Sequence, residues 1–141
     1  MNKEAIKKII PHRDPMLLID EVIEMQEGES LTAKFLVNAD REIFRGHFPE
    51  EPVFPGVYTV ECMAQAADIL LLSMPKYQNT IPFFIGINNV KFKAKIKPGD
   101  EIVIRVTLTE DRAEKGIGIC TGEVYNGETL AASGEVVLAM R

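Results

Sequence analysis

The sequence predicts an α+β fold, in which several antiparallel strands form a sheet against one long helix. Segment 101–111 alternates between polar and apolar residues, which gives a strand one apolar face made of Ile102, Ile104, Val106 and Leu108. Asn126-Gly127 lies between two further strand-like segments and is a strong hairpin signal. Segment 56–73 is apolar almost all round, so a helix here must lie against the sheet or be wrapped by it.

The other elements follow in chain order. The first is a short amphipathic helix or turn at 2–10, which Pro11 stops. A Pro-rich turn at 44–55 precedes the long helix. The expected strands cover 16–25, 31–38, 82–97, 101–111, 116–125 and 129–140. No repeat, linker or low-complexity segment interrupts them, so residues 1–141 are expected to form one domain.

The composition argues against several classes of protein. The net charge is -5 and neither end carries a basic cluster, which is a poor match to nucleic-acid binding. No apolar run reaches the roughly 20 residues needed to span a bilayer, and the N-terminus lacks the apolar core of a signal peptide, so we expect a cytoplasmic protein. The two histidines and two cysteines show no metal-ligand spacing, and no phosphate-binding glycine pattern is found. We therefore expect no metal and no organic cofactor.

A narrow polar stripe interrupts the apolar helix. Glu61, Gln65 and Asp68 are spaced four and three residues apart, so they lie within about 60° of one another on the helix. An unpaired buried carboxylate is costly, so the stripe should face either water or a functional cavity. Both alternatives stay open on this pattern alone: the solvent side of a surface helix, or a site.

His47 lies in a turn that restricts the backbone on both sides. Gly46 precedes it, and Pro49 biases Phe48 toward an extended conformation. Histidine is the usual general acid or base near neutral pH, although a structural histidine bonded within the turn is the alternative. With Glu61, His47 would form a pair that removes one proton and delivers another. The second histidine, His12, is interpreted as structural.

Three motifs resemble one family. They are "IPHRDPMLLIDEV" at 10–22, "GHFPEEPVFPGVYTVECMAQ" at 46–65 and "FIGINNVKFKAKIKPGD" at 84–100. The chain resembles the (3R)-hydroxyacyl-[acyl-carrier-protein] dehydratases of bacterial fatty-acid synthesis, of the Z type. The resemblance implies a hot-dog fold, a curved antiparallel sheet wrapped around a central helix. It also implies a homodimer whose site combines His47 of one subunit with Glu61 of the other, and a trimer of such dimers.

The resemblance implies that a 3-hydroxyacyl thioester on acyl carrier protein loses water to give the trans-2-enoyl thioester. A Glu at position 61, where related dehydratase-isomerases carry Asp, points to the branch that does not isomerise. We assign His47 as the base and Glu61 as the group that protonates or orients the hydroxyl, and the reverse division stays open. The Gly56 amide, at the positive end of the helix, would stabilise the thioester oxygen, and Gln65 would steady Glu61.

Two further surfaces follow from this interpretation. Candidates for lining an acyl tunnel are Phe83, Phe84, Ile85 and Asp68, with core packing as the alternative for the three apolar residues. A carrier protein is expected to be acidic, so docking on this acidic chain requires a local basic patch. Four alternating lysines would lie on one strand face, as a docking patch or as an ordinary solvated face: Lys91, Lys93, Lys95 and Lys97.

Departures from the family pattern leave rival functions open. The family usually carries Tyr in place of Asp14, Leu in place of Tyr58 and a small residue in place of Asp68. One rival is a hot-dog thioesterase acting on acyl-CoA or acyl carrier protein, against which the "GHFP" element argues. Another is a non-catalytic acyl-chain binder, against which the presence of both His47 and Glu61 argues. A nucleophilic Cys62 is a third, but it lies about 100° from Glu61 on the helix and has no adjacent base.

Overall fold

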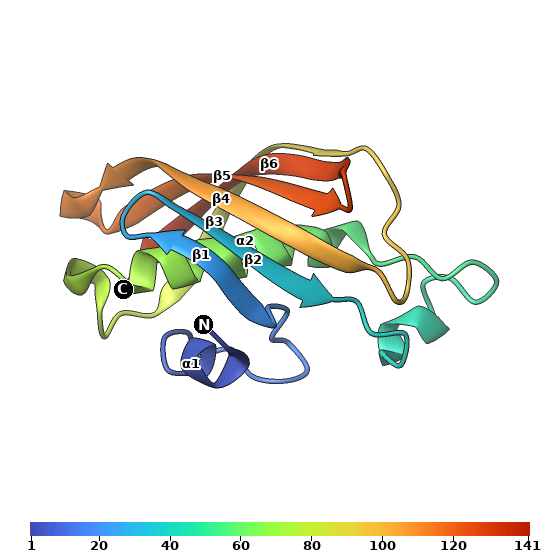
Figure 1. Cartoon of the computed structure of the whole chain (residues 1–141). Coiled ribbons are helices and arrows are strands. Elements are labelled where there is room, and N and C mark those ends of the chain that lie inside the picture. The colour runs from blue at the N-terminus through green and yellow to red at the C-terminus, as the bar shows by residue number, and fades with distance from the viewer.

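The computed structural model describes all 141 residues, which form one antiparallel sheet and one long helix (Figure 1). The helix, α2, spans Gly56–Leu72. The strands are β1 (Glu21–Gln26), β2 (Ser30–Leu36), β3 (Pro82–Phe92), β4 (Glu101–Arg112), β5 (Ile117–Asn126) and β6 (Thr129–Met140). They lie in the order β1-β2-β4-β5-β6-β3, and every neighbouring pair is antiparallel. The predicted α+β class and the hot-dog arrangement are confirmed.

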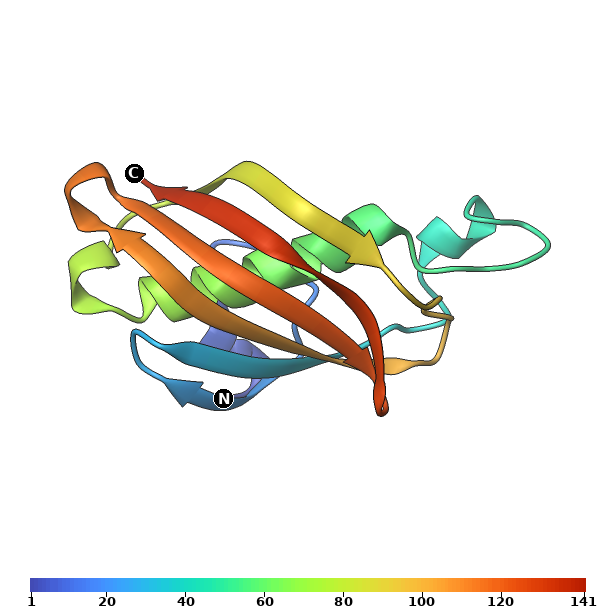
Figure 2. The ribbon, with the colours of Figure 1, turned by 90° about the horizontal axis from the view of Figure 1, so that it is seen from above.

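The long helix crosses beneath the curved sheet, as the view from above shows (Figure 2). Two glycines on β5 permit a close approach. A Cβ atom at Gly118 would lie 2.7 Å from the side chain of Leu71, and one at Gly122 would lie 2.8 Å from that of Met63. Such distances are below normal contact, so the sheet carries no side chain where the helix packs most tightly against it.

The N-terminal segment covers the side of α2 that faces away from the sheet (Figure 1). It begins with α1 (Lys3–Lys7), capped by the side chain of Asn2. Its apolar residues are almost fully buried, namely Ile6, Ile10, Leu17, Leu18 and Ile19. The helix is therefore enclosed on two sides, which explains why its sequence is apolar almost all round.

Two predicted strands have different bounds in the structure: one begins later and the other ends earlier than predicted. The first strand begins at Glu21, not at residue 16, because 16–20 runs over α2 and bonds to it. The strand predicted at 82–97 ends at Phe92. Beyond it the amides of Lys93 and Ala94 both donate to the carbonyl of Ala131, so the regular pairing stops there. Short 3₁₀ turns cover Glu42–Arg45, Pro75–Tyr77 and Ala113–Lys115.

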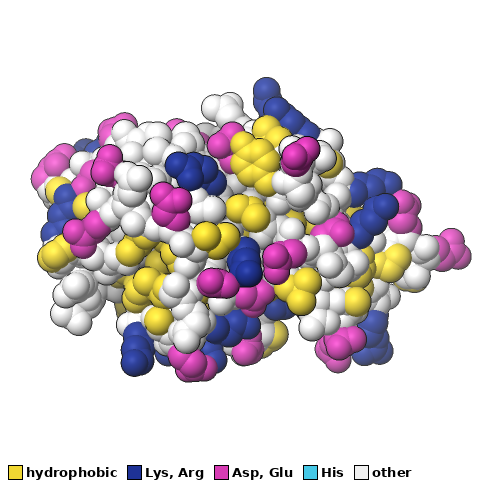
Figure 3. All heavy atoms as spheres, in the orientation of Figure 1, with side chains coloured by type: hydrophobic (Ala, Val, Ile, Leu, Met, Phe, Trp, Pro, Cys, Tyr) yellow, Lys and Arg dark blue, Asp and Glu magenta, His cyan; other side chains and the backbone are white.

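Strand β3 leaves one sheet edge unpaired, because its only partner is β6. Its apolar side chains are largely exposed in the single chain: Phe83, Phe84, Ile85, Ile87 and Phe92. Elsewhere, acidic and basic side chains are interspersed over the face that Figure 3 shows. None of the helices has the length and apolar character needed to cross a membrane.

Candidate active site

The loop that carries His47 leaves the body of the molecule at the N-terminal end of α2 (Figures 1 and 2). Several backbone bonds fix it. The His47 amide donates to the carbonyl of Ile43, and the amide of Val53 donates to the carbonyl of His47. The amide of Phe54 donates to the carbonyl of Ile96, which ties the end of the loop to the segment after β3. A loop closed in this way holds its side chain in a defined position.

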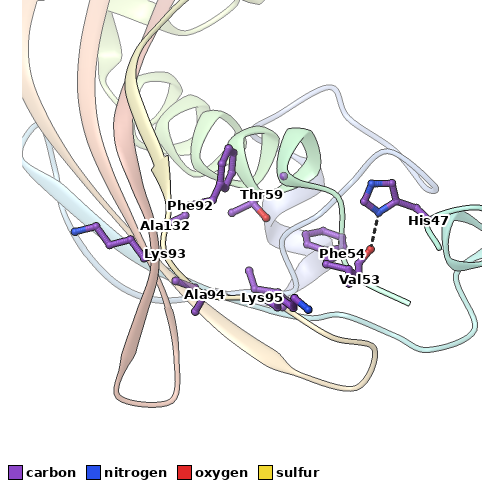
Figure 4. Close-up of a pocket in the computed structure, with 12 residues that line it drawn as sticks. His47, Val53, Phe54, Thr59, Phe92, Lys93, Ala94, Lys95 and Ala132 are labelled. Atoms are coloured by element: carbon purple, nitrogen blue, oxygen red, sulfur yellow. Dashed lines mark hydrogen bonds between the residues drawn. The ribbon is translucent and has the colours of Figure 1, made fainter. Parts of the chain in front are cut away.

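The imidazole of His47 is oriented by one hydrogen bond. Its Nδ1 lies 2.9 Å from the carbonyl oxygen of Val53, drawn as a dashed line in Figure 4. A carbonyl only accepts, so Nδ1 carries the proton and Nε2 presents a free lone pair. The ring also stacks on Phe48, with centroids 4.0 Å apart. The ring is therefore arranged to accept a proton at Nε2.

A pocket of about 390 Å³ opens beside this imidazole. Figure 4 shows His47 on one side of it and Phe92, Lys93 and Lys95 on the other, with Thr59 at the start of α2. The complete lining is His47, Val53, Phe54, Gly56, Thr59, Phe92, Lys93, Ala94, Lys95, Ile96, Ala131 and Ala132. The pocket thus combines an apolar wall with one titratable ring. Two lysines border it, and the amine of Lys93 points away from His47 in Figure 4.

The first turn of α2 contributes free hydrogen-bond donors to this pocket. The amides of Gly56 and Val57 make no hydrogen bond within the chain. A Cβ atom at position 56 would lie 2.9 Å from the ring of Phe92, so glycine is the residue that leaves room there. Free amides at a helix N-terminus attract negative charge. Gly56 is therefore placed to interact with a developing oxyanion.

Glu61 lies on another side of α2 and is held by Gln65. The Nε2 of Gln65 donates to Oε2 of Glu61 at 2.8 Å and to the carbonyl of Met16. The Oε1 of Gln65 accepts from the amide of Leu18, which fixes the orientation of the side-chain amide. Because Oε2 of Glu61 accepts from Gln65, a proton on the carboxyl belongs on Oε1, which makes no hydrogen bond within the chain.

His12 and Asp68 complete this side of the helix. The Nε2 of His12 lies 3.7 Å from Oε2 of Glu61 and 3.7 Å from Oδ2 of Asp68. Burial lowers the pKa of His12, against the charge of Glu61, which raises it. Burial, with a further contribution from Glu61, raises the pKa of Asp68 well above its ordinary value. Sequence reasoning kept His12 outside the site, whereas the structure brings it next to Glu61.

The prediction that the polar stripe faces water or a cavity is correct only for Glu61. Gln65 is fully buried and Asp68 is 3 % exposed, because the N-terminal segment covers both. The predicted role of Asp68 in an acyl tunnel is not supported, since Asp68 lines none of the larger pockets and faces His12 instead.

His47 and Glu61 do not meet within one chain. No ring nitrogen of His47 lies within 4 Å of the carboxylate of Glu61, and the His47 pocket excludes Glu61. Thr59, which lines that pocket, is two residues from Glu61 and therefore points about 160° away on the helix. A site that uses both side chains needs a second copy of the chain.

The remaining sequence-predicted residues lie on exposed surfaces. Phe83, Phe84 and Ile85 line none of the larger pockets and lie on the unpaired strand β3. Of the four lysines, only Lys91 belongs to β3, so the expected single strand face does not extend beyond Phe92, but all four are exposed.

A second pocket, of about 410 Å³, flanks the Glu61 side of α2. Tyr58, one turn before Glu61, contributes to it, and so does Met16, whose carbonyl binds Gln65. The remaining lining residues are Pro15, Leu18, Arg41, Glu42 and Ile43. Sequence reasoning missed this pocket because residues far apart in the chain form its walls.

Comparisons with known proteins identify the family of this chain. The model of the FabA-like domain family matches residues 10–135. The chain belongs to the FabA-like family. Among curated members, the 3-hydroxyacyl-[acyl-carrier-protein] dehydratase FabZ of Ligilactobacillus salivarius is 48% identical over 113 residues, which is 80% of this chain and 81% of that protein. The protein of the same name from Oceanobacillus iheyensis is 40% identical, over 100% of this chain and 99% of its own length.

Solved structures place this FabA-like protein among hot-dog folds. The dehydratase heterocomplex ApeI:P from Xenorhabdus doucetiae superposes with a TM-score of 0.81 at 19% identity, covering 96% of this chain and 90% of that one. A single-residue mutant of the fluoroacetyl-CoA-specific thioesterase FlK superposes with a TM-score of 0.64 at 21% identity, over 83% of this chain and 95% of its own. At these identities the likeness concerns the fold alone.

Proposed function

We propose that this FabA-like protein is a 3-hydroxyacyl-[acyl-carrier-protein] dehydratase, which converts the (3R)-hydroxyacyl thioester to the trans-2-enoyl thioester without isomerisation. The observation that carries the proposal is the pair of fixed titratable groups, a histidine oriented by Val53 and a glutamate oriented by Gln65. The relatives named FabZ dehydratases match over 80% or more of the chain and support the same reaction.

His47 acts as the base in this proposal. Its Nε2 takes the proton from the carbon next to the thioester carbonyl, and the electron pair of that C–H bond forms the new double bond. The C–O bond at the third carbon breaks in turn, and the hydroxyl leaves as water with a proton from Oε1 of Glu61. No atom or electron is left over, so the reaction needs no redox partner. That it requires no metal or organic cofactor stays a prediction.

Charge that develops on the thioester oxygen is stabilised at the start of α2. The Gly56 amide is free and lies in the same pocket as His47. A donor aimed at a developing oxyanion in a sheltered site is worth several kcal/mol, commonly about 3. The thioester therefore lies across the helix N-terminus, with its reacting carbons toward the imidazole.

The complete site requires a homodimer. His47 and Glu61 lie on different sides of α2, while β3 offers an unpaired edge with exposed Phe83, Ile85 and Ile87. Pairing of two such edges about a twofold axis would join the sheets and cover these side chains. In this arrangement each site takes its base from one subunit and its acid from the other. The trimer of dimers that the sequence resemblance implies stays a prediction, as does a cytoplasmic location.

The four exposed lysines, which follow one another along residues 91–97, form the proposed docking patch for the acyl carrier protein. Lys93 and Lys95 line the pocket itself, although Lys95 is paired with Glu51 at 2.8 Å. We expect Lys93→Glu to raise KM for substrate on the carrier protein and to leave that for a small pantetheine thioester unchanged. Lys115→Glu is the matched control, because Lys115 is exposed in the turn between β4 and β5, and Figure 1 shows this turn at the end of the molecule far from the start of α2.

The reverse reaction tests the proposed function directly. Purified protein is mixed with a trans-2-enoyl thioester on acyl carrier protein, and hydration is followed by loss of the ultraviolet absorbance of the conjugated thioester. We expect hydration by the native protein and its loss in His47→Ala and Glu61→Gln, with unchanged circular dichroism. Release of free carrier thiol without hydration would identify a thioesterase instead, and neither activity would leave an acyl-binding protein.

Mixing the two inactive variants tests the shared site. If each site combines two chains, a mixed dimer of His47→Ala and Glu61→Gln subunits has one intact site and one that lacks both groups. Random exchange makes half of the dimers mixed, each with one of its two sites intact, so about a quarter of the native activity should return. Activity that stays absent after demonstrated subunit exchange would place both groups in one chain's site.

A further inference from the structure

Two titratable side chains, the half-buried His12 and the buried Asp68, lie next to Glu61 and have no role in the proposed reaction. His12 comes from the N-terminal segment, and Asp68 lies two turns along α2 from Glu61. The Nε2 of His12 is close to both carboxyl groups, that of Asp68 and that of Glu61. The side chain of Asp68 is 5% exposed and that of His12 is 18% exposed. Both side chains are less exposed than those of a surface ion pair, whose charged groups are in contact with water.

The polar atoms of this pair are incompletely satisfied. The Nδ1 of His12 and the Oδ1 of Asp68 are buried without a hydrogen-bond partner. Native proteins rarely leave such atoms unpaired, because a buried polar atom without a partner destabilises the fold. A buried Asp on the covered face of the helix, facing only a histidine, is therefore an arrangement that stability alone does not explain.

The charges that surround the pair restrict its protonation. The titratable groups near the pair and Glu61 are Arg13 in the segment of His12, Cys62 on α2 and Cys120 on β5. Arg13 is occupied by backbone carbonyls of its own segment, and burial raises the pKa of both thiols, so they stay protonated. Glu61 is thus the carboxylate whose charge the pair of His12 and Asp68 can sense.

We propose that His12 and Asp68 are positioning residues that share one proton behind Glu61 and move it toward Glu61 as that side chain gives up its own. The inference rests on the proposed function, in which Glu61 is the acid. While Glu61 is neutral, the proton stays on Oδ2 of Asp68, 3.7 Å from the Nε2 of His12, and these two atoms move closer for the proton to pass.

When Glu61 protonates the departing hydroxyl, its Oε2 becomes negative. The Oδ2–H bond of Asp68 then breaks and an Nε2–H bond forms on His12, which places an imidazolium between two carboxylates. The net charge of the pair does not change, so no proton has to enter from water during the step. Gln65 holds the same Oε2 from the other side, which keeps Oε1 directed at the substrate.

Nitrogen NMR of the ring tests this without any need for activity. The chain has only two histidines, so a His47→Gln variant assigns the ¹⁵N signals of His12 by elimination. Glu61→Gln stays neutral at position 61 at every pH, so we expect its His12 ring to remain neutral as the pH is raised. In the native protein, we expect the ring to become protonated as the pH is raised and Glu61 loses its proton. Asp68→Asn should abolish that difference, because it removes the source of the proton. Identical spectra in the native and Glu61→Gln proteins would overturn the proposal.

Kinetics provide a second readout. We expect Asp68→Asn and His12→Gln each to lower kcat about tenfold with KM within about twofold, since the effect falls on the transition state. The double variant should be no worse than either single variant, because both residues act through one proton. Independent, multiplied losses would refute a shared role. Met63→Leu, equally buried on α2 but facing Gly122, is the matched control and should keep its activity.

The two proposals fail separately. If the native protein hydrates no enoyl thioester, the proposed function is wrong, and the NMR comparison still decides whether the pair follows the charge of Glu61. If hydration occurs but the His12 signals do not respond, only the shared proton is wrong.

Discussion

Replacing Gln65 by Met would test how much of the fold and of the site depends on one buried amide. Methionine has a similar length and no branch, so it fills the space but makes no hydrogen bond. The change leaves three groups without their partner: the amide of Leu18, the carbonyl of Met16 and the Oε2 of Glu61, each now bonded at 2.8 Å.

The expected loss follows from the burial of these groups. Leu18 is 1% exposed, so its amide cannot find water, and an unsatisfied buried group costs about 1–3 kcal/mol. The carbonyl of Met16 adds a similar or smaller amount. We expect Gln65→Met to lower the free energy of unfolding by about 3 kcal/mol, a large share of the roughly 5–15 kcal/mol of an ordinary domain.

Urea denaturation at one fixed protein concentration measures this change, since the midpoint of an oligomer depends on concentration. Met63→Leu is the control, because Met63 is fully buried on the same helix and its side chain makes no hydrogen bond. Hydration activity should fall about tenfold in Gln65→Met and should be kept in Met63→Leu. A loss of stability below about 1 kcal/mol would show that the three bonds do not hold the N-terminal segment.

Three further outcomes are expected. The pKa of Asp68 is raised above its ordinary value of 3.8. The stability that Asp68 contributes is therefore fully present below about pH 3.8 and is lost as the pH rises through the raised pKa. In urea, the stability of Asp68→Asn relative to the native protein should therefore increase from about pH 5 to pH 8. The thiols of Cys62 and Cys120 are fully buried, and burial raises the pKa of Cys120 to about 12, so a thiol reagent should label neither until the protein unfolds. Gly122→Ala, which places a methyl group 2.8 Å from Met63, should lower the melting temperature, at a cost of about 1–3 kcal/mol.

Local sequence signals predicted the elements that depend on neighbouring residues. The apolar run at 56–73 matches α2 to within one residue, and the Asn126-Gly127 hairpin is found with Gly127 at a φ of 62°. The strand at 82–97 was predicted too long for a physical reason. Its alternation is a local property, whereas its end depends on where the partner strand, which begins at Thr129, turns away.

In the site too, the features that depend on neighbouring residues could be predicted, and those that depend on distant segments could not. The motif around His47 and the helical spacing of Glu61 and Gln65 are short-range patterns, so sequence alone could point to these residues. That His12 lies 3.7 Å from Glu61, across 49 positions of sequence, could not be read from any period or spacing. The helical period assigns Asp68 to a face, but only the path of the N-terminal segment decides that this face is covered.

The bonds that hold Gln65 connect residues 47 and 49 positions apart, whereas the hairpins join near neighbours along the chain. Contacts so distant in sequence bear a greater cost of loop closure, so they are expected to form late in folding. In a folding intermediate whose sheet and helix are complete but whose first 20 residues are still detached, His47 would be in place. Glu61 would not yet be oriented, because the N-terminal segment that fixes Gln65 is absent. During refolding, the return of activity should therefore lag behind the return of circular dichroism, and the delay would time the arrival of the N-terminal segment on the helix.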